Sequence, residues 1–407
     1  MKSINKYVAS FALLLCLIFS SCVDSLVEDP VEGGKNIHRT AIKSRSLDDA
    51  LACADELFAQ IDGSATKSST RVVKTVDFLM DSKTRSGKRD TLMYVINYED
   101  NRGFALVGKS FASRGVYAIS NKGSICLDDT INNVGLSMFI NTYINDALLS
   151  SIIPVDKPIY VYLLKRKVEP RLPNSVAAWV QSHPYNVYTP VINGHQSVVG
   201  CVPLAVGMLC RYYQYPEYLN NQLVNWPAII EENTDEISKL LAILGSREYL
   251  NTSVDRPDER GTDTGGIAKF FSKCNFDTIG SLNNVSFYSN RKVAFDFIAS
   301  GSVNKRAAPV LISGQNVNSQ GEIKSHMWVV DGFMEMSKKA KININIPEIP
   351  WTESDPYLHC VWGWGENANG YFLYSLDNQA LEQDKSIGIP KYSNLRMWGL
   401  YEVTHVK

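Results

Sequence analysis

The sequence lacks an excess of either charge. Its 41 Lys and Arg residues balance 42 Asp and Glu residues and leave a formal net charge of -1. A chain with so little net charge has no overall field that would draw it to nucleic acid, to an anionic membrane surface or to a cationic partner. We therefore expect each partner to be recognised locally, and we expect no nucleic acid among them.

The sequence also lacks an apolar run long enough to cross a bilayer. Its first apolar run, over residues 8–19, has about a dozen residues, whereas a membrane-spanning helix needs about 20. Lys2 and Lys6 precede this run and small residues lead from it to Cys22, a pattern typical of a bacterial lipoprotein signal. This pattern predicts a signal peptide over residues 1–21 and an exported protein held by lipid on Cys22 at the outer membrane or cell surface. Ordinary signal cleavage nearby, and later release of a processed domain, stay open.

Cysteines are few and scattered. If Cys16 is removed with the signal and Cys22 carries lipid, six of the eight cysteines remain: Cys53, Cys126, Cys201, Cys210, Cys274 and Cys360. They contain no C-x-x-C pair, and their spacing is not that of a dense disulfide framework. The cysteine pattern therefore indicates no zinc site and no redox motif. It favours an exported protein in which a single cysteine has a special chemical role.

Residues 22–167 predict a tether followed by a small α+β domain with no catalytic group of its own. Hydrophobic periodicity predicts two helices, over residues 46–61 and 132–152. Strand-like runs cover residues 72–80, 92–98 and 103–108, with a hairpin signal at 101–103 and polar loops over 64–70 and 82–89.

A cluster of three cations, Lys165-Arg166-Lys167, follows a strand-like run over residues 159–164. Such a run is often a solvated linker, but exposed linkers are also where proteolytic nicking concentrates. Both interpretations stay open, and we place a domain boundary here, between residues 22–167 and 168–407.

Cys201 stands at the predicted start of a helix. Gly200 precedes it, and Pro203 falls in the first turn, where a missing N–H is tolerated. Apolar residues then recur at helical spacing as far as Tyr213, and Pro216 ends the segment. The start of a helix favours a thiolate, and its N–H groups can donate to a developing oxyanion. Cys201 is therefore a candidate nucleophile, with a buried apolar cysteine as the alternative.

His326 is the candidate partner of that thiol. It follows Ser325 at the polar start of a predicted strand that ends at Asp331-Gly332. A histidine there can face a cleft, although a structural role is the commoner one. Further along, Trp362-Gly363-Trp364 predicts either a core element or a lid that shields a thiolate–imidazolium pair from water.

Four separated motifs resemble those of the streptopain-type cysteine proteases, a papain-like group made as zymogens. In chain order they are Trp179, Gln181 and Pro184-Tyr185-Asn186; Gly200-Cys201-Val202 to Tyr212-Tyr213-Gln214-Tyr215-Pro216; Ser325 to Gly332, with Ser325 in place of Gly; and Val361 to Gly365. The resemblance covers residues 168–372. It implies an α+β, papain-like fold, in which a helix carrying the cysteine packs against an antiparallel sheet carrying the histidine, after a small α+β propeptide domain.

The resemblance also implies roles for single residues. Cys201 would be the nucleophile and His326 the general base and acid. Gln181 would donate a side-chain hydrogen bond to the oxyanion hole, and Trp362 and Trp364 would wall the site. The implied reaction is hydrolysis of protein or peptide substrates through a thioester acyl-enzyme, without a cofactor. Residues 168–407 would be the catalytic domain, and the propeptide within residues 22–167 its intramolecular inhibitor.

Val361 is the main departure from the family pattern. It stands where the family has an Asn that can orient the imidazole, and the valine side chain cannot form a hydrogen bond. We expect reduced but real activity, with Asn367, Asn369 or a backbone carbonyl in place of the missing amide.

Two other functions stay open. An inactive homologue that binds peptides is favoured by Val361 alone. A surface lipoprotein that binds glycan or protein would use exposed aromatics such as Tyr212, Tyr213 and Tyr215, and it requires the ordered motifs to be coincidence.

Restoring the family's residue at position 361 tests the effect of this departure. In the processed enzyme, Val361→Asn should raise kcat, because the amide would hold the imidazole in its useful orientation. Steady-state kinetics on a peptide substrate measures the change. An unaltered kcat would show that the site does not need that hydrogen bond.

Overall fold

The computed structural model describes residues 44–62, 71–80, 90–128, 133–151, 159–253, 257, 260–262, 264–279, 284–286, 308–317, 323–341, 353–374, 396–398 and 402–406. Contacts separate residues 1–40 from a unit formed by residues 41–407. The predicted signal, the lipid site at Cys22 and the predicted loops over 64–70 and 82–89 lie outside the described residues. None of the helices that are described is long and apolar enough to span a membrane.

Helix α2 (Leu47–Ile61) opens the described chain. Ser46 caps it, because the Ser46 hydroxyl accepts from the Asp49 N–H while the Asp49 carboxylate accepts from the Ser46 N–H. Such a reciprocal cap contributes about 1 kcal/mol. The helix buries an apolar face that includes Ala54, Leu57 and Phe58, so the predicted amphipathic helix over residues 46–61 is confirmed.

The other predicted elements of the amino-terminal region are also present. They are β1 (Val73–Met80), β2 (Thr91–Tyr98), β3 (Phe104–Gly108) and α3 (Val134–Ser151). The structure adds the short 3-10 helix η1 (Glu99–Asn101) and β4 (Val116–Ser120). The hairpin between β2 and β3 turns through Asp100 and Asn101, both with positive φ, where Asn and Asp are well tolerated.

One nine-stranded antiparallel sheet joins the regions before and after residue 168. Its order is β1-β2-β3-β4-β15-β14-β13-β12, with β5 paired to β13. The later strands are β12 (Val310–Val317), β13 (Ile323–Lys341), β14 (Glu353–Val361) and β15 (Gly370–Leu373). The two regions meet where β4 pairs with β15, at Ile119 opposite Tyr371 and Ala118 opposite Phe372. The amino-terminal region thus continues the sheet that carries His326.

The strand β5 (Ile159–Val168) contains the cluster of three cations. Lys167 and Arg166 pair with Met334 and Glu335 of β13, and the Arg166 guanidinium lies 3.0 Å from the Glu335 carboxylate. The interpretation of these residues as a free linker is therefore wrong. The physical reason is that β13 extends beyond β12 and offers β5 an open edge to pair with.

Strand β13 also runs past the point where the sequence predicts its end. A register shift between Val330 and Gly332 marks the Asp331-Gly332 position, but the strand continues to Lys341 because β14 and β5 pair with its second half. The predicted end at Asp331-Gly332 is wrong, and this dipeptide forms a bulge instead.

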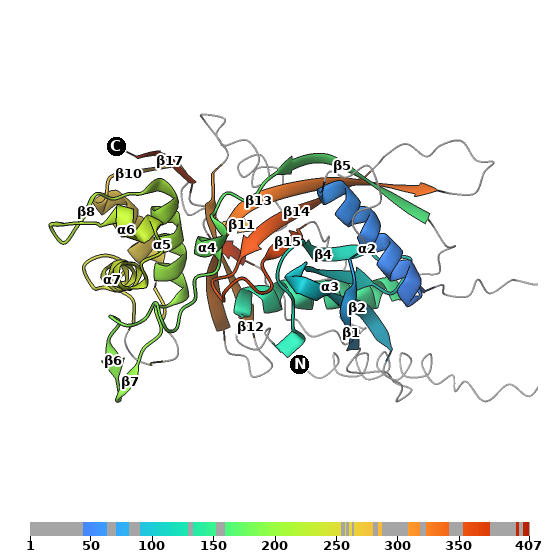
Figure 1. Cartoon of the computed structure of the whole chain (residues 1–407), viewed down its shortest axis with the longest axis horizontal. Helices are drawn as coiled ribbons and strands as arrows, with labels where there is room; N and C mark the ends of the chain where they lie inside the picture. The colour runs from blue at the N-terminus through green and yellow to red at the C-terminus, as the bar shows by residue number, and fades with distance from the viewer. Residues whose placement is uncertain are drawn as a thin grey trace, which may run out of the picture. The chain divides into compact units, whose positions relative to one another are not determined.

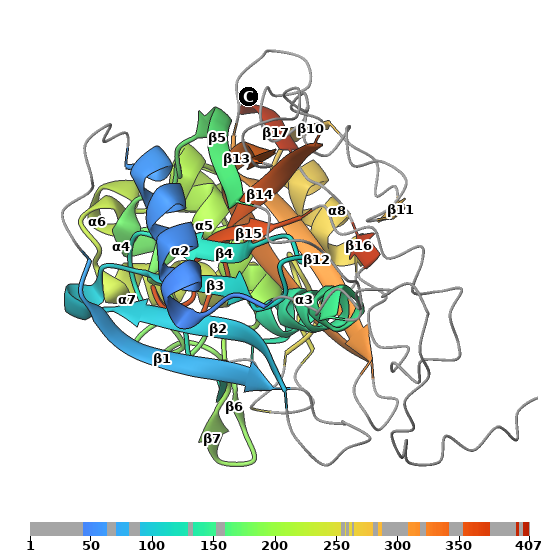
Figure 2. The same cartoon turned by 90° about the vertical axis from the view of Figure 1, so that its right-hand side faces the viewer.

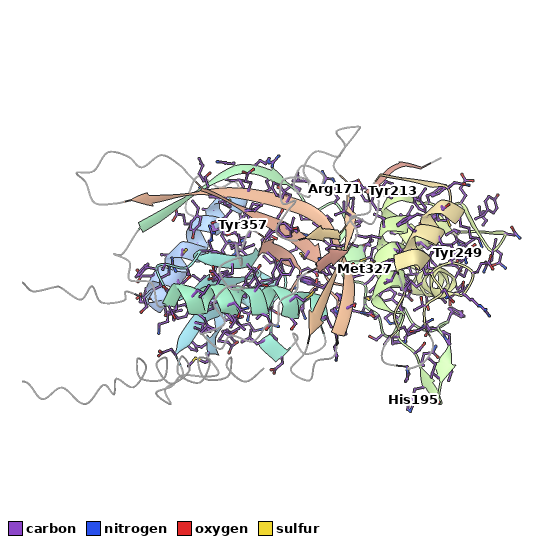
Figure 3. All side chains as sticks on the ribbon, turned by 180° about the vertical axis from the view of Figure 1, so that it is seen from behind. Arg171, His195, Tyr213, Tyr249, Met327 and Tyr357 are labelled. Carbon is purple, nitrogen blue, oxygen red and sulfur yellow. The ribbon has the colours of Figure 1, made fainter. Side chains whose placement is uncertain are left out.

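Helices and short hairpins form the remaining layer. They are α4 (Asn174–Ala177), α5 (Cys201–Tyr213), α6 (Trp226–Ile230), α7 (Thr234–Gly245), α8 (Thr264–Lys273), and the hairpins β6 (Val191–Ile192) with β7 (His195–Gln196) and β8 (Tyr218–Leu219) with β9 (Gln222–Leu223). Two further pairs are β10 (Phe276–Ile279) with β17 (Glu402–Val406), and β11 (Asn284–Ser286) with β16 (Arg396–Trp398). His195 lies at the tip of its hairpin, away from the sheet (Figure 3).

The strands β12, β13 and β14 bury both of their faces. Helices α5, α6 and α7 lie on one side of β13, and α3 lies on the other (Figures 1 and 2). Because side chains alternate along a strand, Met327 and Val329 join the core beneath α5, whereas Trp328 and Val330 join the core beneath α3. Met327 accordingly lies next to the α5 side in Figure 3. The predicted α+β fold, with the cysteine helix packed against the antiparallel sheet that carries the histidine, is confirmed.

Candidate active site

Cys201 is the first residue of α5, as its sequence context predicts. Gly200 precedes the helix with φ +95°, and a Cβ added there would lie 2.9 Å from the carbonyl oxygen of Arg260. Only glycine fits this position, because both the positive φ and the close backbone exclude a side chain. Cys201 is partly exposed and packs against the core beneath α5. The thiol is therefore held at the positive end of the helix dipole.

Gln181 lies beside the segment that leads into Cys201. Its carbonyl oxygen accepts from the Val199 N–H at 2.8 Å. The Asn186 amide donates to the Ser197 carbonyl oxygen at 3.0 Å, so a second residue of the same motif holds the same segment. The first two motifs therefore meet in space, next to the start of α5.

The two tryptophans of the Trp-Gly-Trp run have different surroundings. The Trp362 ring is only 1% exposed, and its Nε1 donates to the Ala368 carbonyl oxygen at 2.9 Å. The Trp364 ring is 40% exposed, and its backbone forms a bridge with Val180, the neighbour of Gln181. Trp364 is therefore exposed close to Gln181 in the chain fold, whereas Trp362 is part of the aromatic core.

His326 is buried on the α3 side of the sheet. Its imidazole stacks on Trp328 with 6.2 Å between ring centroids, and its Nε2 donates to the Trp362 carbonyl oxygen at 2.9 Å. Gly135 of α3 covers the ring so closely that an added Cβ would lie 3.0 Å from the His326 Cδ2 and 2.8 Å from the Trp362 ring. Burial lowers the pKa of His326 from 6.5 to about 4, so the imidazole is neutral at neutral pH.

The dipeptide Trp362-Gly363 contacts His326 on one side and the helix that begins with Cys201 on the other. The Trp362 carbonyl oxygen holds His326, and the next residue, Gly363, contacts Leu204 in the first turn of α5, where an added Cβ would lie 2.8 Å from the Leu204 side chain. Within the described part of the chain, the imidazole has this one hydrogen bond, and none joins it to Cys201. The nucleophile and base candidates therefore lie on different faces of the sheet.

Val361 packs in the core beneath α5 with Leu311, Met327 and Val329. An Asn at this position would bury an amide in apolar surroundings, which costs about 1–3 kcal/mol unless a partner is found. The sequence left three possible partners for the imidazole: Asn367, Asn369 or a backbone carbonyl. In this structure His326 donates to a backbone carbonyl oxygen, that of Trp362. The Asn369 side chain is engaged elsewhere, with Trp362 N–H, Ala177 O and Gly365 O.

Asp331, the acidic residue of the histidine motif, has a role that the sequence did not reveal. Its carboxylate lies 2.6 Å from His359 Nδ1 and accepts from the backbone N–H groups of Arg171 and Leu172 at 3.1 and 2.9 Å. It therefore anchors the chain just after β5. The only sequence signal was its place in the motif.

Gly135 and Arg260 were also missed. Gly135 stands in an apolar helix and Arg260 in a charged loop, and neither context carries a local signal. Each acts by meeting residues that are distant in sequence, Gly135 at His326 and Arg260 at Gly200.

Comparisons with known proteins found similarity to a protein family and to solved structures. Residues 179–372 match the Peptidase C10 family. A Prevotella intermedia prointerpain A fragment, a mutant, is similar in structure, with a TM-score of 0.51 and 14% identity over 82% of this chain and 100% of that chain. Active wild-type interpain A from the same organism has a TM-score of 0.39 and 16% identity over 60% of this chain and 96% of that one. The curated proteins contain no match.

Acid should weaken the packing of α3 over His326. The imidazole binds a proton below about pH 6.5 when exposed but only near pH 4 when packed. The stability that depends on the neutral imidazole is thus full above about pH 6.5 and falls by roughly 3 kcal/mol as the pH drops through 4. Urea unfolding of a Cys201→Ala precursor between about pH 4 and pH 7 measures this loss.

The matched control adds His326→Gln to the same Cys201→Ala background. Glutamine does not titrate, so this part of the pH dependence should disappear. An equal acid sensitivity in both variants would assign the effect to other groups.

Proposed function

We propose, on the premise that residues 179–372 form a cysteine-type peptidase domain of the Peptidase C10 family, that this chain is an endopeptidase made as a latent precursor, with Cys201 as nucleophile and His326 as base. The observation that carries the proposal is the position of His326. Its imidazole is packed under α3, while Cys201 begins the helix on the other face of the same sheet.

In the active form, the thiolate of Cys201 attacks the carbonyl carbon of the scissile peptide bond. The oxyanion that forms accepts from the Cys201 N–H and the Gln181 side chain. The imidazolium of His326 gives its proton to the leaving amine, which leaves a thioester on Cys201. Neutral His326 then takes a proton from water, the hydroxide attacks the thioester, and the carboxylate product and the thiol are released.

The packed state cannot carry out the first step. A thiolate–imidazolium pair needs a protonated histidine, and burial lowers the pKa of His326 to about 4. The ring is also covered by Gly135, so it cannot turn toward α5 while α3 is in place. Departure of α3 would expose the imidazole to water, return its pKa toward 6.5 and free it to reach the thiol. This supports the amino-terminal region as an intramolecular inhibitor.

The amino-terminal region holds the Trp364 loop as well. The Ala368 N–H donates to the Ser124 carbonyl oxygen at 2.8 Å, and the Asn101 amide donates to the Glu366 carboxylate at 3.2 Å. These contacts come from the turns at the ends of β3 and β4. Removal of this region would therefore release the histidine and the loop that carries the exposed tryptophan together.

Activation by cleavage near Lys165 to Lys167 requires β5 to leave its place beside β13. A protease binds an extended chain whose backbone is free to pair with it, whereas the backbone of β5 pairs with β13. The chain after the cut is retained, because Asp331 holds the N–H groups of Arg171 and Leu172. We therefore propose that fraying of β5 precedes processing.

The cellular location is part of the proposal. Lipid on Cys22 would anchor the exported precursor to the outer membrane or cell surface, and cleavage near Lys165 to Lys167 would detach the peptidase domain from that anchor. Cys22 lies outside the described residues, so this step depends on the sequence pattern alone.

One observation favours a second function, an inactive homologue that binds peptides. Val361 leaves the imidazole without the family's Asn side chain. A surface-binding role for Tyr212, Tyr213 and Tyr215 has less support, because all three are partly buried and pack against the core beneath α5.

Labelling with an epoxide that alkylates active-site thiolates tests the peptidase. In the processed protein at neutral pH, Cys201 should be modified at least tenfold faster than the other cysteines, because only this thiol pairs with an imidazolium. Peptide mass mapping locates the adduct. His326→Ala should abolish the preference, and equal labelling of all accessible cysteines would argue against the function.

Replacing Gly135 tests the latency. Gly135→Leu places a side chain where the His326 and Trp362 rings lie, so α3 should be displaced and the uncut precursor should react with the epoxide at Cys201 about tenfold faster. Mass mapping on the uncut chain measures it.

Ser137→Leu is the matched control for this change. It adds the same side chain two residues further along α3 and should leave the precursor latent. If the Gly135→Leu precursor is folded by circular dichroism and as unreactive as wild type, α3 does not hold the site inactive.

A further inference from the structure

We infer that Arg260 is a positioning residue for the Cys201 thiolate, and this inference rests on the proposed function. Its buried guanidinium holds the segment that leads into α5 and supplies a positive charge behind the start of that helix. Two sets of contacts and the charge balance of Arg260 support this inference.

The first contact is with the segment before the nucleophile. Arg260 Nη1 donates to the carbonyl oxygens of Val198 and Val199 at 3.4 and 3.5 Å. The backbone of Arg260 lies against Gly200, where an added Cβ would meet the Arg260 carbonyl oxygen at 2.9 Å and its Cβ at 3.2 Å. Arg260 therefore touches each of the three residues that precede Cys201.

The second contact fixes Arg260 itself. Its Nε donates to the Ser253 carbonyl oxygen at 3.1 Å, and Ser253 N–H donates to the Gly261 carbonyl oxygen at 2.8 Å. The hydroxyls of Thr252 and Thr262 lie 3.1 Å apart in the same pair of segments. These hydrogen bonds between residues 252–253 and 260–262 restrict the movement of the guanidinium away from the start of α5.

The third point is the charge balance. Arg260 is only 5% exposed, and the acceptors of its hydrogen bonds are carbonyl oxygens throughout, with no ion pair to a carboxylate in the described part of the chain. A buried cation without a partner anion is costly, and it favours the ionised form of any acid nearby. The thiol of Cys201, one residue beyond the segment that Arg260 holds, is such an acid.

The other charged groups around α5 do not take this role. Arg211 and Glu232 lie at the far end of the helix, 4.0 Å apart, so they balance each other. His326 of β13 is on the opposite face of the sheet in the latent state. In the precursor, the helix N-terminus and the buried charge of Arg260 therefore both favour a thiolate at position 201.

The uncut precursor isolates this effect, because its imidazole is packed away from the thiol. Iodoacetamide alkylation of Cys201, followed by peptide mass mapping across pH, should be half-maximal below the ordinary thiol value of about 8.5. Arg260→Met should move the midpoint up by about one pH unit and slow alkylation near neutral pH about tenfold. Arg260→Lys keeps the charge, so it should stay within a few tenths of a pH unit of wild type.

Two controls separate a charge effect from a structural one. Arg211→Met removes a buried guanidinium from the other end of α5 and should lower the melting temperature without moving the midpoint. Arg260→Gln keeps donors for the carbonyl oxygens but no charge, and it replaces the Met variant if that variant does not fold. Its midpoint should rise as well.

The outcomes are distinct. A lower melting temperature with an unchanged midpoint in the Arg260→Met or Arg260→Gln variant would overturn the inference and leave Arg260 as a structural clip. Loss of His326-dependent labelling in the processed wild-type protein would instead overturn the proposed peptidase function, whatever the Arg260 variants show.

Discussion

The alternation of side chains along β13 is the constraint on which the rest of the site depends. Successive residues face opposite sides, so His326, Trp328 and Val330 belong to the core under α3, while Met327 and Val329 belong to the core under α5. Strand β13 thus places the His326 imidazole against α3 of the amino-terminal region, and it places Met327 and Val329 against α5, the helix of Cys201. The latency that we propose follows from this geometry, because His326 can serve as the base only if its side chain leaves the α3 face.

Two glycines allow helices to approach the sheet closely on its two faces. Gly135 lets α3 lie directly on the His326 and Trp362 rings, and Gly363, with φ +78°, lets the chain after β14 reach the first turn of α5. The dipeptide Trp362-Gly363 therefore has a hydrogen bond to the imidazole at one end and a contact with Leu204 at the other.

Much of the fold and part of the site could be predicted because the signals were local. Helix caps, strand periodicity and the Gly-Cys start of α5 are written in neighbouring residues, and the structure has those elements at nearly the predicted bounds. The errors at β5 and at the end of β13 have another cause. Lys165 to Lys167 look solvated by composition. A strand forms there because β13 offers a distant partner, with Glu335 opposite Arg166 and 169 positions away in sequence.

The absence of the family's Asn at position 361 is easier to understand with both cores in view. Position 361 faces the apolar core beneath α5, where valine packs well and an amide would need a partner. The imidazole in turn has a backbone acceptor at Trp362, which no side-chain substitution removes. On our proposals, this hydrogen bond, or its equivalent after α3 leaves, fixes the His326 ring. Arg260 and the helix N-terminus stabilise the Cys201 thiolate. The imidazolium and the thiolate are then each positioned by a separate set of contacts. Val361 then removes one group that could orient the His326 ring. It leaves unchanged the interactions that stabilise the Cys201 thiolate, on which nucleophilic attack depends.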